Sequence, residues 1–228
     1  QLVTPTKIIT TNTVKASNPV GIEFFGSNGG TVNITSSNAN SNVLLNGSIN
    51  NKEGSTSINV QNNILQQNDG ALITTKTLQL TAGNDIGSSA EAVRTIASEK
   101  LSASAANGNV NVAQILGNLS LGNVTADHGT VTLSADGNIT NAPGASTVRG
   151  KRVELTSTNG TLGGDENSPL IVETGFADLT NATNADKVKY GLKASAMGNI
   201  NIENRKWTGG GNAEGNLLID AVTSTAGD

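Results

Sequence analysis

The chain contains no cysteine and almost no aromatic residues. Without cysteine it forms no disulfide, offers no thiolate nucleophile and binds no metal through sulfur. Its 228 residues include three Phe, one Tyr and one Trp. Aromatic side chains supply much of the buried area in most globular cores. We therefore expect a core built from Val, Ile, Leu and Ala.

Charge and long apolar runs are also scarce. Charged residues make up 14% of the chain, and the formal net charge of −4 offers no cationic surface for nucleic acid. No segment approaches the roughly 20 apolar residues that a membrane-spanning helix needs. The first residues lack the charged and apolar regions of a signal peptide. We expect neither nucleic-acid binding nor membrane insertion, and interpret the chain as a fragment of a larger protein.

The sequence is rich in short segments in which aliphatic and polar residues alternate. Such alternation predicts strands with one buried face. Asn-Gly, Asp-Gly and Gly-Asn pairs between the segments indicate turns, so the predicted fold class is all-β. The expected inward-facing pairs are Val32/Ile34, Ile58/Val60, Leu78/Leu80, Val110/Val112, Leu119/Leu121, Val131/Leu133, Val153/Leu155 and Ile200/Ile202.

Two all-β architectures fit these segments. Antiparallel hairpins would give a sandwich or barrel, whereas a solenoid would stack each unit on the previous one. The spacing favours the solenoid, because Ile58 to Leu78 is 20 residues, Val110 to Val131 is 21 and Val131 to Val153 is 22. We predict a parallel β-helix with about 20–22 residues per coil and on the order of nine to eleven coils.

The stretch GTVTLSADGNIT illustrates one predicted coil. Val131 and Leu133 point into the core and the threonines beside them point out. Asp136 and Gly137 turn the corner, and Ile139 returns to the core. We attribute the frequent Gly and Asn at such corners to left-handed backbone conformations, which these residues tolerate best. Because like side chains stack on like, the core needs no bulky rings.

We expect a single β-helical domain over residues 1–228, interrupted by irregular segments. Phe24 and Phe25 are predicted to cover the first coil, since a solenoid must cap its exposed end. The expected subdivision is an entry or capping segment over 1–30, regular coils over 31–172, a loop or hairpin excursion over 173–196 and further coils over 197–228.

Residues 88–103 have two interpretations. A one- or two-turn helix would place Ala90, Val93, Ile96 and Ala97 inside. The alternative is a further strand centred on Ile96.

The segments KTLQLTAGNDIG, GNVNVAQILGNLSLGNVTADHGTVTLSADGNIT and STVRGKRVELTSTNGTLGG resemble the repeats of filamentous haemagglutinin-like exoproteins. These are large adhesins of two-partner secretion in Gram-negative bacteria. The resemblance covers about half the chain and implies a right-handed parallel β-helix, export through an outer-membrane transporter and a role in attachment. The secretion domain of that family is not apparent, so the resemblance is to its shaft or binding region.

Catalytic chemistry has only weak support. Parallel β-helices include polysaccharide lyases and hydrolases, whose sites need clustered acidic residues. The nearest match is Asp127 beside His128, with Asp136 in the next turn, and we interpret these residues as solvated. Asp165 and Glu166 hint once at a calcium repeat without a second copy. We predict no catalytic residues, no metal site and no cofactor, with a polysaccharide-active enzyme as the alternative.

The rare aromatic residues are the candidate binding residues. Tyr190 and Trp207 lie in irregular segments, where an exposed ring could stack on a sugar or anchor a protein contact. The alternative is that each ring covers the solenoid end or fixes its loop. The Asn-x-Ser/Thr sequons are weak glycosylation candidates that fit hydrogen-bonding ladders equally well. They lie at Asn33, Asn46, Asn118, Asn123, Asn138, Asn159 and Asn181.

The sequence therefore predicts a secreted, non-enzymatic segment of a bacterial surface adhesin. Its β-helix would act as a monomeric spacer that presents loops to a glycan or protein receptor on a host cell or other surface. An outer-membrane transporter would be its partner during secretion. A purely structural stalk is the remaining alternative, favoured if the segment from Phe176 to Leu192 packs against the rod and Trp207 is buried.

Overall fold

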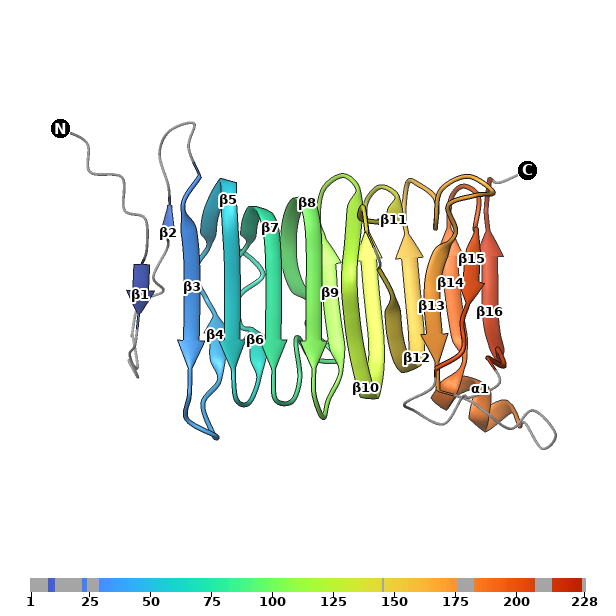
Figure 1. Ribbon diagram of the computed structural model, residues 1–228, viewed down its shortest axis with the longest axis horizontal. Coiled ribbons are helices and arrows are strands. Elements are labelled where there is room, and N and C mark those ends of the chain that lie inside the picture. The colour runs from blue at the N-terminus through green and yellow to red at the C-terminus, as the bar shows by residue number, and fades with distance from the viewer. Residues whose placement is uncertain are drawn as a thin grey trace.

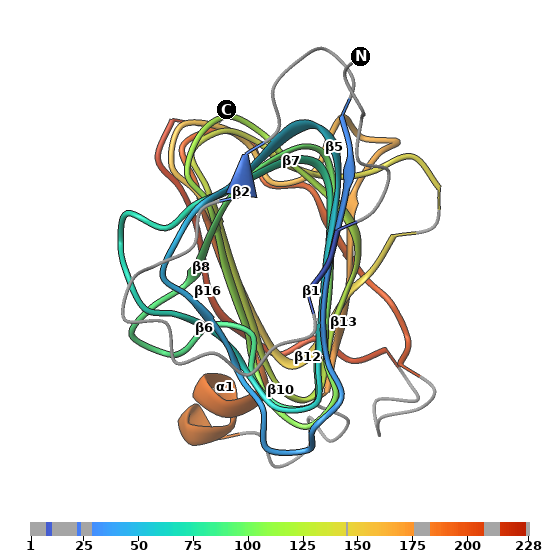
Figure 2. The same ribbon diagram turned by 90° about the vertical axis from the view of Figure 1, so that its left-hand side faces the viewer.

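The chain folds into a right-handed parallel β-solenoid of about 8 turns. A computed structural model describes residues 29–144, 146–175, 183–207 and 215–226, together with the backbone of 8–10 and 22–23. Every strand pairing in these residues is parallel. Seen from the N-terminal end, the chain turns clockwise as it recedes (Figure 2). The predicted fold class is confirmed.

The solenoid consists of strands and one described helix. They are β1 Ile8–Thr10, β2 Ile22–Glu23, β3 Thr31–Ser36, β4 Val43–Leu45, β5 Ile49–Val60, β6 Ile64–Gln66, β7 Ile73–Ala82, β8 Val93–Ala105, β9 Val110–Gln114, β10 Leu119–Ala135, β11 Ile139–Asn141, β12 Val148–Ser157, β13 Leu170–Thr174, α1 Asn184–Tyr190, β14 Leu192–Ala196, β15 Ile202–Asn204 and β16 Ile219–Ser224. Long strands such as β5, β8 and β10 bend at a corner and contribute to two faces (Figure 1).

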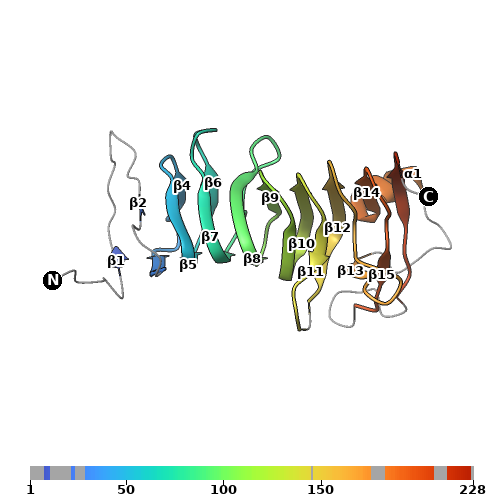
Figure 3. The ribbon, with the colours of Figure 1, turned by 90° about the horizontal axis from the view of Figure 1, so that it is seen from above.

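Two faces carry most of the sheet. We call front face the column formed by 31–36, 55–60, 77–82, 100–105, 121–126, 148–150 and 170–174. We call back face the column formed by 110–114, 131–135, 152–157, 192–196 and 219–224. Figure 3 shows the strands of successive coils side by side along the axis.

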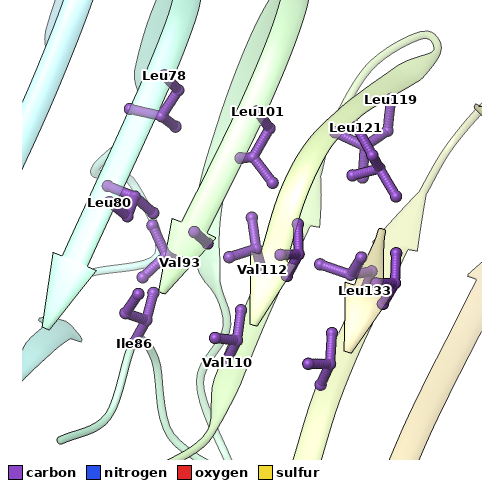
Figure 4. Packing of buried hydrophobic residues seen from close by; sticks show 14 of the residues in the cluster. Leu78, Leu80, Ile86, Val93, Leu101, Val110, Val112, Leu119, Leu121 and Leu133 are labelled. Atoms are coloured by element: carbon purple, nitrogen blue, oxygen red, sulfur yellow. The ribbon is translucent and has the colours of Figure 1, made fainter. Parts of the chain in front are cut away.

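The core is a set of aliphatic columns between the faces. Val110 stacks on Val131, Val131 on Val153, and Val153 on Leu192, and all four are at most 2% exposed. Leu, Ile and Val from neighbouring coils fill the interior in the same way (Figure 4). The inward orientation predicted for Val131 and Leu133 and the return of Ile139 to the core are confirmed. Stacking of like residues explains why the core needs few rings.

The coil period is broader than predicted. Val131 lies beside Val153, 22 residues on, as expected, but Ile58 lies beside Leu80 and not Leu78. The alternating pattern looks the same after a shift of two residues, so the sequence left this register open. Leu101 and its partner Leu121 are 20 residues apart, which marks a short coil. Longer coils and the C-terminal excursions use up residues, which leaves about 8 turns and not nine to eleven.

Glycine and asparagine occupy the corners for a different reason from the one predicted. Among the described residues only glycines have positive φ, and Gly137 is not one of them. A Cβ at Gly137 would lie 2.5 Å from Oδ1 of Asn118 and 2.9 Å from the carbonyl carbon of Gly117 in the preceding coil. Gly137 therefore permits close approach of successive corners.

Corner asparagines form what we call the asparagine ladder along the stack. Oδ1 of Asn42 accepts the backbone N–H of Asn63 at 3.1 Å, and Oδ1 of Asn63 accepts that of Asp85 at 2.9 Å. Asp85 accepts the N–H of Asn109 at 2.7 Å, and Asn109 accepts that of Thr130 at 2.8 Å. Each side chain thus satisfies a backbone donor of the next coil, where a bend would leave it unpaired.

Residues 88–103 resolve in favour of the strand. β8 begins at Val93, and Val93, Thr95 and Ala97 point inward, whereas Ile96 is half-buried on the outer side. The helical interpretation and the inward position of Ile96 are wrong. Pairing of β8 with β7 on one side and β9 on the other decides the conformation, which local periodicity could not.

The first part of the C-terminal excursion contains a helix, where a loop or hairpin was predicted. The side chain of Thr183 accepts the N–H of Asp186, and Asp186 in turn accepts the N–H of Thr183, which forms a capping box at the start of α1. These hydrogen bonds lower the pKa of Asp186. The helix is followed by Gly191 and by β14, which rejoins the solenoid at Leu192.

Arg152 fastens α1 and the last strand to the stack. Its side chain is 8% exposed, and it donates to the carbonyl of Lys187 in α1 at 2.6 Å and to Asp220 in β16 at 2.7 Å. It also pairs with Glu154. Burial alone would lower the pKa of Arg152, but the hydrogen bonds to Asp220 and Glu154 outweigh it and raise the pKa. The helix is therefore held against the rod.

Part of the predicted entry segment already belongs to the sheet. Ile8 lies beside Val32, and Ile22 lies beside Ile49, so β1 and β2 extend the parallel stack. Phe24 and Phe25 fall outside the described residues, as does Phe176 at the start of the predicted excursion. No helix in the described part of the chain is long and apolar enough to cross a membrane.

Candidate functional site

The most prominent hollow of the described surface is a groove on the front face. It has a volume of about 450 Å³ and crosses β7, β8 and β10. Because alternate residues of a strand point to opposite sides, its floor consists of outward positions between the buried leucines and alanines. The lining residues are Gln79, Leu80, Thr81, Lys100, Ser102, Ala103, Ser104, Gly122, Asn123, Thr125, Pro143 and Ser146.

A register irregularity shapes the floor of this groove. Leu101 pairs with Leu121 but Ala103 pairs with Val124, so Gly122 and Asn123 together oppose the single residue Ser102. An extra residue of this kind re-aims the side chains around it. Here it leaves Asn123 exposed on the outer surface.

Gly122 provides the space in which two neighbouring side chains lie. A Cβ at this position would be 2.3 Å from Oγ of Ser102 and 3.3 Å from Cδ of Lys100. The aliphatic stem of Lys100 therefore lies beside the backbone of β10, one coil further along. This places the lysine at the groove and not on a free edge.

The polar side chains of the groove differ from those of the corners in their hydrogen bonding. Among the described residues the structure records no hydrogen bond or ion pair for the side chains of Gln79, Lys100, Ser102 and Asn123. Thr125 donates to Ser104 at 3.1 Å within the same face. The groove thus presents amide, hydroxyl and ammonium groups with unused capacity, whereas the asparagine ladder is occupied by backbone donors.

One wall of the groove comes from the connection between β11 and β12. Pro143 and Ser146 belong to it, and Ser146 is buried with its hydroxyl donating to the carbonyl of Ala142 at 3.2 Å. Gly144 has φ of 104°, a conformation that favours glycine. Figure 3 shows this connection projecting beyond the strands on the front side of the stack.

Beyond the groove, the front face carries a column of alternating charge. Arg149 donates to Asp127 through Nε at 2.8 Å and Nη2 at 3.1 Å, and its Nη1 lies 3.7 Å from Glu173 in the next coil. The hydrogen bonds to Asp127 outweigh burial and raise the pKa of Arg149. Arg205 pairs with Glu203 at 2.8 Å, which lowers the pKa of Glu203. The column links coils by charge.

The structure places the two aromatic candidates in different settings. Trp207 is only 4% exposed, with the guanidinium of Arg149 5.6 Å from its ring centroid. Its position matches the alternative in which the ring packs against the solenoid. Tyr190 is half-buried at the end of α1, and the Lys189 ammonium lies 4.8 Å from its ring centroid. The fold does not bring Tyr190 and Trp207 into a shared printed contact.

The acidic residues considered for catalysis have separate partners. Asp127 binds Arg149, and Asp136 accepts from Asn159 at 2.7 Å and from the N–H of Gly117 at 3.3 Å. No group of three or more His, Asp or Glu side chains suited to a metal ion occurs in the described ranges.

The single calcium-like segment is a turn. Oδ1 of Asp165 accepts the N–H of Asn167 at 3.1 Å, and Asp165 and Glu166 are both exposed. This agrees with their interpretation as a hydrated corner.

The sequons divide by the use of their side chains. Asn118 accepts the N–H of Asn138 at 2.9 Å, and Asn138 accepts that of Thr161 at 2.8 Å, so these two form a second ladder. Asn159 donates to Asp136. Asn46 and Asn123 are exposed, and Asn33 is half-buried in β3. Asn181 falls outside the described residues.

Sequence reasoning missed the groove. Its residues are ordinary outward positions in three separate segments, and only the stacking of coils brings them together. The single local signal was Gly122 and Asn123 inside the apolar run LSLGNV, where an interrupted alternation indicates a bulge.

No family model matches the chain, and neither a curated protein nor a solved structure matches it.

Proposed function

We propose that this chain is a non-enzymatic segment of a secreted bacterial surface adhesin, in which the solenoid is a spacer that presents its lateral surface for attachment. The observation that carries the proposal is the uninterrupted stack of about 8 parallel coils on continuous aliphatic columns. Coil stacking gives stability by nearest-neighbour contacts, so such a rod extends reach without a compact centre. The resemblance of its repeats to haemagglutinin-like shafts supports the same assignment.

The surface properties support attachment more than catalysis. The acidic residues named above are engaged in ion pairs and turns, and the outward positions of the front face are mainly hydroxyl and amide side chains. Polar, uncharged surfaces suit the recognition of glycans or proteins through hydrogen bonds. A receptor on a host cell or other surface and an outer-membrane transporter during secretion are the partners that this proposal implies, with the segment itself monomeric.

A stalk without its own receptor site is the second candidate. The burial of Trp207 and the anchoring of α1 by Arg152 favour it, because both show the C-terminal excursions packed against the rod. The ligand site would then lie elsewhere in the parent protein.

Attachment is tested with beads that carry the purified chain. We expect saturable binding of the beads to cultured epithelial cells, competed by excess soluble chain. Tyr190→Ala tests the half-buried ring near α1, and Lys193→Ala on the exposed side of β14 is the matched control. Absence of saturable binding by chain with a native β-sheet circular dichroism spectrum would contradict attachment and favour the stalk.

A further inference from the structure

The groove over β7, β8 and β10 has the features of a ligand site. Four side chains converge on it without a recorded hydrogen bond among the described residues, namely Gln79, Lys100, Ser102 and Asn123. Elsewhere on the solenoid, amide side chains such as Asn63 and Asn138 are used to satisfy the backbone. From this contrast we propose that the groove binds an acidic oligosaccharide. The proposal deepens the attachment function proposed above and rests on it.

The chemistry of the lining selects sugars over other ligands. Amides and hydroxyls each donate and accept hydrogen bonds, as the hydroxyls of a pyranose do. Gln79, Ser102 and Asn123 come from three successive coils, so their polar groups form a row along the axis of the rod. Strands in a sheet are spaced by about 4.8 Å, and such a row suits an extended chain of sugars. Apolar ligands would find little surface of their own kind.

Charge selects the acidic sugars. Lys100 is the one ionisable side chain among the described residues that line the groove, and none of them carries a carboxylate. The chain as a whole has a formal net charge of −4, so this local positive site is distinctive. An ammonium is a compact point charge with three donors, which suits a carboxylate. A single lysine offers too few contacts for nucleic acid, which is held through many phosphates.

The local backbone is arranged for this purpose. The irregularity at Gly122 and Asn123 turns the Asn123 amide outward, and the missing Cβ of Gly122 leaves room for the Lys100 stem. The wall with Pro143 closes one side and leaves the groove open along the strands. With no aromatic ring among the described lining residues, single-site affinity is expected to be modest, with dissociation constants on the order of 1 mM. Several copies on one surface would raise the apparent affinity.

The test is a titration of the full chain followed by NMR of its backbone amides. The probes are 3′-sialyllactose, its neutral parent lactose, and tetragalacturonate as an acidic sugar from a different source. We expect saturable shifts at the amides of Ser102, Gly122 and Asn123 with at least one acidic probe, and roughly tenfold weaker binding of lactose. Which acidic probe binds distinguishes sialylated from uronic-acid glycans.

Two substitutions separate charge from hydrogen bonding. Lys100→Gln is expected to weaken the acidic probe roughly tenfold and leave lactose unchanged. Asn123→Ala is expected to weaken the acidic and the neutral probe alike. Lys193→Gln, an exposed lysine on the back face, is the matched control and should change neither.

The proposal is overturned if neither acidic probe gives saturable shifts at these amides, if lactose binds as tightly as 3′-sialyllactose, or if Lys193→Gln acts like Lys100→Gln. Its failure is distinguishable from failure of the attachment function. Beads that still bind cells while the groove binds no sugar would place attachment on another surface, whereas sugar binding without cell binding would point to a different receptor surface.

Discussion

The coils over residues 31–126 and those over 146–226 share a core and differ in what surrounds it. In the first region the outward positions of the front face are mostly uncharged, the turns between faces are short, and the asparagine ladder lines one corner. In the second region the front face carries the alternating charges of Arg149, Glu173 and Arg205, and the turns expand into excursions that include α1.

The difference shows that the core and the surface of this solenoid vary independently. The column from Val110 to Leu192 stays buried across both regions. Each coil needs only its neighbours, so an insertion of many residues between Val153 and Leu192 leaves the stack intact. Hydrogen bonds along the corner and ion pairs across the face are two ways of linking coils outside the same aliphatic core.

The largest effect is expected where both regions depend on the same column. Leu133 is fully buried between Val112 and Leu155, so Leu133→Asp removes apolar burial and places a carboxylate in the core. We expect a loss of more than about 4 kcal/mol in the free energy of unfolding. Thr132→Asp, one residue away on the outer side, should be tolerated. Equal loss of β-structure by circular dichroism in both variants would refute the inward and outward assignment.

A smaller and more local effect is expected from Arg152→Ala. Removal of the guanidinium leaves Glu154 and Asp220 without their partner and frees α1. We expect a loss of roughly 2–3 kcal/mol, reduced from the value for a fully buried pair because the carboxylates are partly exposed. Faster hydrogen exchange should be confined to α1 and β16. Lys193→Ala is the control, and exchange that accelerates equally in β5 and β7 would show that the two regions are not locally separable.

The smallest effect concerns the corners of the first region. A Cβ at Gly83 would lie 2.0 Å from the carbonyl oxygen of Gln61 in the preceding coil. Gly83→Ala should therefore cost about 1–3 kcal/mol in urea unfolding. At Gly70 the nearest atom is a side-chain oxygen of Asn68 at 3.3 Å, so Gly70→Ala should be nearly neutral. Equal costs at the two positions would argue against close coil approach as the role of the corner glycines.

The sequence predicted the fold because its information is periodic. Alternation placed Val131, Leu133 and Ile139 in the core, and the recurrence of similar segments indicated a solenoid. The period of two also explains the misplacement of Leu78 beside Ile58, since a shift by two residues keeps every side chain on its face. Helical and strand patterns were both consistent with residues 88–103, and pairing with β7 and β9 decided between them.

The candidate site was less accessible to such reasoning. Gln79, Ser102 and Asn123 are unremarkable in sequence and meet only because their coils stack. Trp207 stood out as a rare residue, but its burial depends on Arg149, which lies far away in the chain. Local patterns specify faces and turns, whereas a groove or a covered ring arises from contacts between coils.

The most direct test of the central claim, that one continuous aliphatic stack runs through both regions, is amide hydrogen exchange measured coil by coil. We expect the inner strands β5, β7, β10, β12 and β14 to be protected to a similar degree, with faster exchange in α1 and in the connection between β11 and β12. A boundary at which β12 and β14 exchange roughly a hundredfold faster than β5 and β7 would contradict it, because the two regions would then unfold as separate units.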